Sequence, residues 1–223
     1  MEERIFEGLQ YLISYPKDFQ EDKKFPLVIF LHGAGWRNKT IEQFHENACV
    51  QNILKHQDEK GYILLAPHCP KGTWNEWMML LIRLIETYRD TSYVDKTHIH
   101  LTGNSMGGYG TWTLATLRPR WFASAMPLAG GGCPGLAMNL ADLPIRAFHG
   151  LRDKIVDPIE SLQMAKAVNQ CGGRAELILF PEYEHNCWDD VYADEKNFDW
   201  LLSFTAQQDE NLEEDPSLNY YGK

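Results

Sequence analysis

The stretch "HLTGNSMGGYGTW", residues 100–112, places a single serine, Ser105, between Gly103 and Gly107. Residues 103–107 match G-x-S-x-G, in which the serine occupies a sharp strand-to-helix turn that exposes its hydroxyl. Glycine is required two residues to either side, because a side chain there would collide with the adjoining strand or helix. An apolar run before the motif and an Ala/Leu/Thr-rich run after it supply that context. The stretch predicts Ser105 as a nucleophile; the alternative is a glycine-rich turn in which Ser105 only caps the helix.

Short apolar runs alternate with segments of helical length along the chain. The runs cover residues 27–32, 62–67, 98–103, 123–129, 145–150 and 175–180, and the helical segments cover 41–61, 76–90, 105–119, 158–173 and 187–204. Short runs that are apolar throughout fit strands buried on both faces of a parallel sheet. The alternation predicts an α/β fold, with a mostly parallel, doubly wound sheet and helices on both of its faces. Residues 8–16 alternate in polarity and predict an antiparallel edge strand or hairpin.

The length of 223 residues suits one domain, which we place at residues 1–207. Residues 208–223 form the one compositional break, with five acids between Asp209 and Asp215. We expect a solvated and mobile acidic tail there, with a docking segment as the alternative.

Composition excludes several classes of partner. The net charge of −10 leaves no basic stripe for nucleic acid or for an anionic membrane surface. No run approaches the roughly 18 apolar residues of a membrane span, and the acidic start "MEERIFEGLQ" lacks the features of a secretory signal. We therefore expect a cytoplasmic protein, with a secreted mature form as the alternative. The five cysteines include no Cys-x-x-Cys pair, so we expect free thiols, no metal and no cofactor.

A serine nucleophile requires a base and an acid, which follow it in the order acid, then histidine. His185 is the last of eight histidines and lies between the final apolar run and the final helical segment. It is the predicted base, whereas His149, at the end of a run, is predicted to be buried. Asp153 and Asp157 both follow the run that ends at Gly150. Asp157 begins an Asp-Pro-x-Glu helix start and is predicted to cap that helix, which leaves Asp153 as the acid.

An acyl-transfer site also requires amide donors for an oxyanion. The residue after the nucleophile, Met106, supplies one in this architecture, and the loop after an early strand supplies another. The early run ends in His32-Gly33-Ala34-Gly35, so we predict Ala34 as the second donor and Gly33 as the alternative. His32 is predicted to hold this loop in place.

Taken together, these motifs resemble the α/β-hydrolases of the bacterial phospholipase/carboxylesterase type, including dienelactone-hydrolase-like and prolyl-oligopeptidase-like esterases. The matching segments are "FPLVIFLHGAGWRN", "APHCPKGTWNE", "VDKTHIHLTGNSMGGYGTW", "FHGLRDKIVDP" and "YEHNCWDD", and they span about residues 9–205. The family's HG-x-x-D pattern also implies Asp153 as the acid. Two departures, at residues 36–38 and at His68, lie where the resemblance implies the substrate pocket. Trp36, His68, Trp74 and Trp77 are candidates for lining it, with buried packing as the alternative for the tryptophans.

The resemblance implies a serine carboxylesterase that hydrolyses short or compact acyl esters of small molecules. Only about fifteen residues lie between the runs that end at Ala129 and begin at Ile145, too few for a large lid. A stand-alone prolyl-oligopeptidase-like peptidase and a plant-wall acetyl or feruloyl esterase remain open, because the same triad serves each of them. A catalytically inactive binding module is disfavoured because no triad position is missing.

Overall fold

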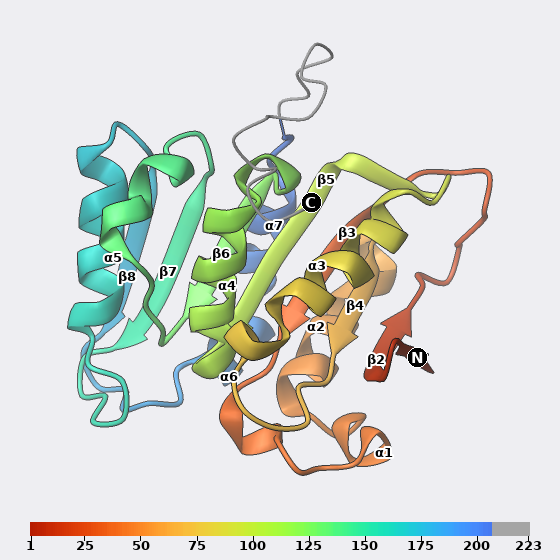
Figure 1. The fold of residues 1–223 in the computed structure, drawn as a ribbon, viewed down its shortest axis with the longest axis horizontal. Coiled ribbons are helices and arrows are strands. Elements are labelled where there is room, and N and C mark those ends of the chain that lie inside the picture. The colour runs from red at the N-terminus through yellow and green to blue at the C-terminus, as the bar shows by residue number, and fades with distance from the viewer. Residues whose placement is uncertain (207–223) are drawn as a thin grey trace, which may run out of the picture.

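The computed structural model describes residues 1–206, in which eight strands form one sheet (Figure 1). The strands lie in the order β1-β2-β4-β3-β5-β6-β7-β8. Their bounds are β1 (Glu2–Phe6), β2 (Leu9–Ser14), β3 (Phe25–Leu31), β4 (Ile63–Pro67), β5 (Val94–Asn104), β6 (Ser124–Leu128), β7 (Ile145–Gly150) and β8 (Ala175–Phe180). All pairings from β4 to β8 are parallel, whereas β2 is antiparallel to both β1 and β4. The predicted parallel sheet with an N-terminal hairpin is confirmed. The predicted acidic tail, 208–223, lies outside the described residues.

Helices cover both faces of the sheet. Those on one face are α3 (Trp74–Arg89), α4 (Met106–Leu117) and α5 (Ile159–Gln170), and those on the other are α1 (Ile41–Phe44), α2 (Ala48–Lys60), α6 (Trp188–Ala193) and α7 (Glu195–Leu202). Three short 3₁₀ helices complete the described elements: η1 (Ala34–Trp36), η2 (Pro119–Trp121) and η3 (Pro134–Leu140).

The central strands serve two hydrophobic cores at once. Leu27, Ile29 and Leu31 of β3 enter the core beneath α3, α4 and α5. Val28 and Phe30 of the same strand enter the core beneath the helices on the opposite face. Since successive side chains of a strand point to opposite faces, a strand covered on both sides is apolar throughout.

Two predicted helices are each divided in the structure. The segment 41–61 breaks before α2, where the side chain of Asn47 accepts a hydrogen bond from the amide of Val50. The segment 187–204 breaks at Asp194, whose side chain accepts from the amide of Lys196 at the start of α7. Both residues satisfy amides that the first turn of a helix leaves free, which favours a new helix start.

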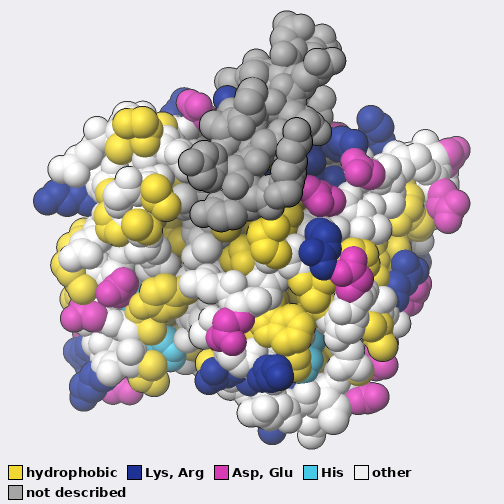
Figure 2. Space-filling model, viewed as in Figure 1, with side chains coloured by type: hydrophobic (Ala, Val, Ile, Leu, Met, Phe, Trp, Pro, Cys, Tyr) yellow, Lys and Arg dark blue, Asp and Glu magenta, His cyan; other side chains and the backbone are white. Residues whose placement is uncertain are grey.

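Large hydrophobic side chains are exposed over η3 and α5 (Figure 2). They include Leu136 and Met138 of η3, together with Ile159 and Leu162 of α5. Ile155, 75% exposed, lies just before α5 on the loop that follows β7. The molecular surface around this loop is therefore partly apolar.

The turn between β5 and α4 depends on backbone contacts that only glycine permits. A Cβ atom on Gly107 would lie 1.8 Å from the carbonyl oxygen of Leu31, and one on Gly103 would lie 2.5 Å from the carbonyl oxygen of Gly107. Real Cβ contacts are never this short, so any side chain at either position would force β3, β5 and α4 apart. The glycines of the motif thus set how closely α4 approaches the sheet.

We predict that Gly107→Ala destabilises the protein by about 1–3 kcal/mol, the usual cost of forcing extra atoms into a packed core. Thermal unfolding would show it as a fall of roughly 2–4 °C per kcal/mol for a domain of this size. Gly135→Ala in η3 is the matched control, because the nearest atom to its Cβ would be the Cys133 sulfur at 3.9 Å. Equal melting temperatures for the two variants would contradict the packing argument.

Candidate active site

Ser105 lies on a strained turn directly between β5 and α4. Its backbone has φ 55° and ψ −117°, a conformation that a residue other than glycine rarely adopts. The amide of Ser105 donates to the carbonyl oxygen of Leu128 at the end of β6, at 2.9 Å. Strain of this kind persists only where the surrounding structure enforces it, and here it presents the serine hydroxyl beyond the carboxyl end of the sheet.

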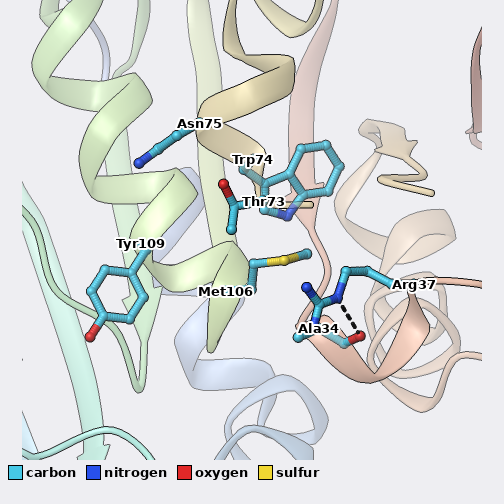
Figure 3. Close-up of a pocket in the computed structure, with 7 residues that line it drawn as sticks. All are labelled: Ala34, Arg37, Thr73, Trp74, Asn75, Met106 and Tyr109. Atoms are coloured by element: carbon cyan, nitrogen blue, oxygen red, sulfur yellow. Dashed lines mark hydrogen bonds between the residues drawn. The ribbon is translucent and has the colours of Figure 1, made fainter. Parts of the chain in front are cut away.

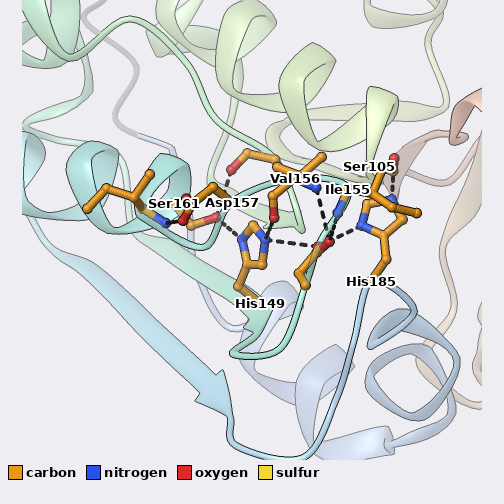
Figure 4. A network of polar contacts seen from close by, with 10 residues as sticks. Ser105, His149, Ile155, Val156, Asp157, Ser161 and His185 are labelled. Carbon is orange, nitrogen blue, oxygen red and sulfur yellow. Dashed lines mark hydrogen bonds and ion pairs between the residues drawn. The ribbon is translucent and has the colours of Figure 1, made fainter.

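A chain of hydrogen bonds connects the serine to a histidine and an aspartate (Figure 4). Ser105 Oγ lies 2.8 Å from His185 Nε2, and His185 Nδ1 lies 2.6 Å from Asp153 Oδ2. Because a carboxylate oxygen accepts only, His185 carries its proton on Nδ1 and leaves Nε2 free to accept the proton of the serine. The structure therefore brings together the three residues predicted as nucleophile, base and acid, in the arrangement of a serine hydrolase triad.

Asp153 is held as a carboxylate by the loop that follows β7. Burial opposes its ionisation, but hydrogen bonds from His185 and from the amides of Val156 and Ile155 outweigh it and hold the pKa of the carboxyl below its ordinary value. The two amides donate to Oδ1 at 3.0 and 2.8 Å. Asp153 is therefore ionised at neutral pH and able to orient the His185 ring.

The acid and the base lie on loops that touch through their backbones. A Cβ on Gly150, the last residue of β7, would lie 2.0 Å from the carbonyl oxygen of Glu184. The amide of Arg152 donates to the carbonyl oxygen of Tyr183 at 2.9 Å. This close approach sets the position of His185 relative to Asp153, and Trp188 packs edge-on against the His185 ring.

The predicted oxyanion donors lie at the starts of two helices. Ala34 is the first residue of η1 and Met106 the first residue of α4, so their amides have no acceptor within their own helix. The loop after β3 passes beside the serine, since a Cβ on Gly33 would lie 3.4 Å from Ser105 Cβ. Amides at helix starts can donate to a developing oxyanion, so Ala34 and Met106 remain the predicted donors.

His32 and Arg37 hold the loop after β3 in place. Burial lowers the pKa of His32 to about 3, so the ring is neutral. Its Nδ1 donates to the carbonyl oxygen of Gly33 at 2.8 Å, and its Nε2 accepts from the amide of Cys69 at 2.9 Å. Arg37 donates to the carbonyl oxygens of Ala34 and Gly72, at 3.2 and 3.0 Å. The loop is therefore tied to the segment that follows β4.

A cavity of about 400 Å³ opens beside the oxyanion donors (Figure 3). It is lined by Ala34, Arg37, Thr73, Trp74, Asn75, Met106 and Tyr109. The lining combines the thioether of Met106 with hydroxyl, amide and guanidinium groups, whereas the side chain of Trp74 is almost wholly buried. A compact acyl or alcohol group with polar substituents fits such a surface.

Of the four residues predicted to line the substrate pocket, Trp74 alone is among those that line this cavity. Trp36 packs against Phe44, and His68 is 1% exposed and donates from Nε2 to the carbonyl oxygen of Trp36 at 3.0 Å. Trp77 packs on the core and donates to the carbonyl oxygen of Lys71. These contacts use the three side chains for packing, as is common for aromatic rings near a site, and their part in substrate binding stays a prediction.

The sequence pattern did not identify Thr73, Asn75 and Tyr109 as residues of this cavity, whereas Arg37 lies in the segment 36–38 that the resemblance placed near the pocket. Tyr109 had a usable signal, because it lies four residues after Ser105 on the same face of α4. Within residues 1–206, no group of three or more His, Cys, Asp or Glu side chains is placed to hold a metal ion. No helix in that part of the chain is both long and apolar enough to cross a membrane.

A solved thermostable esterase superimposes on the chain with a TM-score of 0.79 and 30% sequence identity, covering 88% of the chain. The chain belongs to the α/β-hydrolases. It spans 59% of the length of that esterase. No family model matches the sequence of this hydrolase.

Two sequence relatives differ in what their names describe. A protein named probable feruloyl esterase C of Aspergillus niger is 25% identical over 191 residues, which is 81% of this hydrolase and 68% of the relative. Dipeptidyl-peptidase 5 of Porphyromonas endodontalis is 23% identical over 224 residues, which is 78% of this hydrolase and only 32% of the relative. The same domain thus accompanies different activities in different relatives.

We predict that Asp153→Asn lowers turnover by roughly four orders of magnitude with little change in stability, because the amide favours the wrong tautomer of His185. The side chain of Asp157 accepts from the amide of Ile159, the first residue of α5. Asp157→Ala should therefore cost about 1 kcal/mol of stability and leave turnover near that of the wild type. Kinetics and thermal unfolding of both variants decide the assignment: an inactive but stable Asp157→Ala protein would reverse it.

Proposed function

We propose that the protein is a serine carboxylesterase that hydrolyses short or compact acyl esters. The observation that carries the proposal is the chain of hydrogen bonds from Ser105 through His185 to Asp153, beside two free helix-start amides. These groups provide a nucleophile, a base, an orienting acid and an anion site, which together are the requirements of acyl transfer.

In the acylation step, Ser105 Oγ attacks the carbonyl carbon of the ester while its proton passes to His185 Nε2. The carbonyl oxygen becomes an oxyanion that accepts hydrogen bonds from the amides of Met106 and Ala34. The bond from the carbonyl carbon to the alcohol oxygen then breaks, and His185 returns the proton to that oxygen. The products are the free alcohol and an acyl ester of Ser105.

In the deacylation step, water takes the place of the alcohol. His185 Nε2 removes a proton from the water as the water oxygen attacks the acyl carbon, and the oxyanion forms again at the same amides. The bond to Ser105 Oγ breaks, Ser105 regains its proton from His185, and the carboxylic acid leaves. Asp153 remains ionised throughout and stabilises the imidazolium of His185.

The preference for compact acyl groups rests on the size and surroundings of the cavity. A volume of about 400 Å³ is near the lower end of the range for small-molecule sites. Between β6 and β7 the chain contains only η3 as a regular element, so no helical lid is inserted there. Without such a lid, activity does not depend on a lipid surface.

An aromatic acyl group is the more specific version of the proposal. The relative named as a feruloyl esterase supports it, as does a cavity that places the hydroxyl of Tyr109 and the amide of Asn75 beside Met106. Acetylated sugars remain the alternative among plant-wall esters. A peptidase is the other alternative, and the relative named as a dipeptidyl peptidase, of which the match covers 32%, is the observation behind it.

We expect a panel of substrates to separate these alternatives. The panel comprises aryl esters of increasing acyl length, methyl ferulate, feruloylated and acetylated sugars, and a prolyl amide. Acetyl, butyryl or feruloyl esters should give the highest kcat/KM, long-chain emulsions should give little activity, and the amide should give none. Ser105→Ala is the control for background hydrolysis. Activity that is negligible on short acyl esters and rises sharply on long-chain emulsions would overturn the proposal.

A further inference from the structure

A second histidine contacts the carboxylate of Asp153 and takes no part in the steps above. His149 lies in β7, one residue before Gly150, and neither its side chain nor that of Asp153 is exposed to solvent. His149 Nε2 lies 3.2 Å from Asp153 Oδ2, the same oxygen that receives His185 Nδ1 (Figure 4). It also lies 3.0 Å from the carbonyl oxygen of Val156.

The partners of His149 determine that Nε2 carries a proton. A carboxylate oxygen and a carbonyl oxygen can only accept, so a bare nitrogen between them would leave three lone pairs facing one another in a buried space. With a proton on Nε2, one N–H is shared between Asp153 Oδ2 and the carbonyl oxygen of Val156. His149 is therefore a hydrogen-bond donor to the predicted catalytic acid.

This conclusion does not depend on the charge of His149. On the other side of the ring, Nδ1 lies 2.8 Å from Ser161 Oγ, and Ser161 Oγ lies 2.7 Å from the carbonyl oxygen of Gly130. If the hydroxyl donates to Gly130, both ring nitrogens are protonated; if it donates to Nδ1, the ring is neutral. In both cases the proton on Nε2 remains, and so does its donation to Asp153.

His149 also supports the other oxygen of the carboxylate through Val156. The carbonyl of Val156 accepts from His149, while the amide of Val156 donates to Asp153 Oδ1 at 3.0 Å. The amide of Ile155 donates to the same oxygen at 2.8 Å. Asp153 thus receives four hydrogen bonds, two on each oxygen. His149 donates one of them directly, and it also binds the carbonyl of Val156, whose amide donates another.

We propose that His149 is a positioning residue that fixes the orientation of the Asp153 carboxylate, and through it the ring of His185. The proposal rests on the proposed function, since it assigns a role within the same triad. Without the donor on Nε2, the Oδ2 atom is restrained only by His185, the group that it has to orient. The triad would still assemble, but less often in the productive geometry, so turnover falls while substrate binding does not.

The test uses three substitutions that differ in the donor they retain. In His149→Gln the amide nitrogen reaches the position of Nε2 and can donate to Asp153. In His149→Asn the shorter side chain reaches only the Ser161 side, and His149→Leu removes both contacts. We expect kcat to fall on the order of 10–100-fold in the Asn and Leu variants, because a small misplacement of catalytic groups can cost up to about 100-fold, with KM little changed. The Gln variant should keep kcat close to that of the wild type if the donor is what matters.

His100 in β5 provides a matched control. It is buried, its Nδ1 lies 2.9 Å from Ser124 Oγ, and that hydroxyl donates to the carbonyl oxygen of Leu201 at 2.7 Å. The arrangement repeats the His149–Ser161–Gly130 contacts, but within residues 1–206 His100 Nε2 has no hydrogen-bond partner, and His100 does not contact the triad. His100→Asn should therefore lower the melting temperature without lowering kcat.

A second readout does not require substrate. The 2.6 Å bond between His185 Nδ1 and Asp153 predicts a far-downfield proton resonance in the wild-type NMR spectrum. This resonance should persist in His149→Gln and broaden or disappear in His149→Asn. If the Leu variant does not fold, the comparison of the Gln and Asn variants alone tests the proposal.

The proposal would be overturned if the Gln and Leu variants lost kcat equally. It would also be overturned if the Asn variant kept wild-type kcat and an unchanged resonance. Absence of esterase activity in the wild type would instead count against the proposed function, while the resonance would still test His149.

Discussion

The hydrogen bond from His185 Nδ1 to Asp153 Oδ2 connects two loops that are 32 residues apart in the sequence. Both loops leave the carboxyl ends of neighbouring parallel strands, β7 and β8, whose register pairs Gly150 with Phe180. A charged carboxylate in a buried position is costly unless its oxygens are hydrogen-bonded, and here they are. The same bond fixes the tautomer of His185, and with it the direction in which a proton can leave Ser105.

Close backbone packing makes this geometry reproducible. Glycine at positions 103, 107 and 150 lets strands, helix and loop approach to distances at which any Cβ would collide. The strained backbone of Ser105 is stabilised by the same packing, because β3, β5 and α4 leave no room for the turn to relax. Active sites commonly store strain of this kind, and the hydrophobic cores on both faces of the sheet supply the stability that offsets it.

Sequence patterns predicted the parallel sheet because strands buried on both faces are apolar throughout. Ser105, His185 and Asp153 could be selected because each follows a predicted strand, and parallel strands bring their carboxyl ends to one edge. The aromatic pocket could not be predicted in the same way. The direction in which Trp36 or Trp77 points depends on contacts with Phe44 and with the carbonyl oxygen of Lys71, and a sequence pattern does not specify how the short loops between these residues fold. His149 could be predicted as buried, but its contact with Asp153 depends on how the loop after β7 folds back.

The most direct test of the account is to trap the acyl-enzyme during turnover of a short aryl ester. Acid quenching in the first turnover, followed by proteolysis and mass spectrometry, should find the mass of the acyl group on the peptide that contains Ser105. The adduct should be absent from Ser105→Ala and should accumulate more slowly in Asp153→Asn. Hydrolysis at the wild-type rate by Ser105→Ala, or an acyl group attached to another residue, would contradict the assignment of Ser105 as the nucleophile.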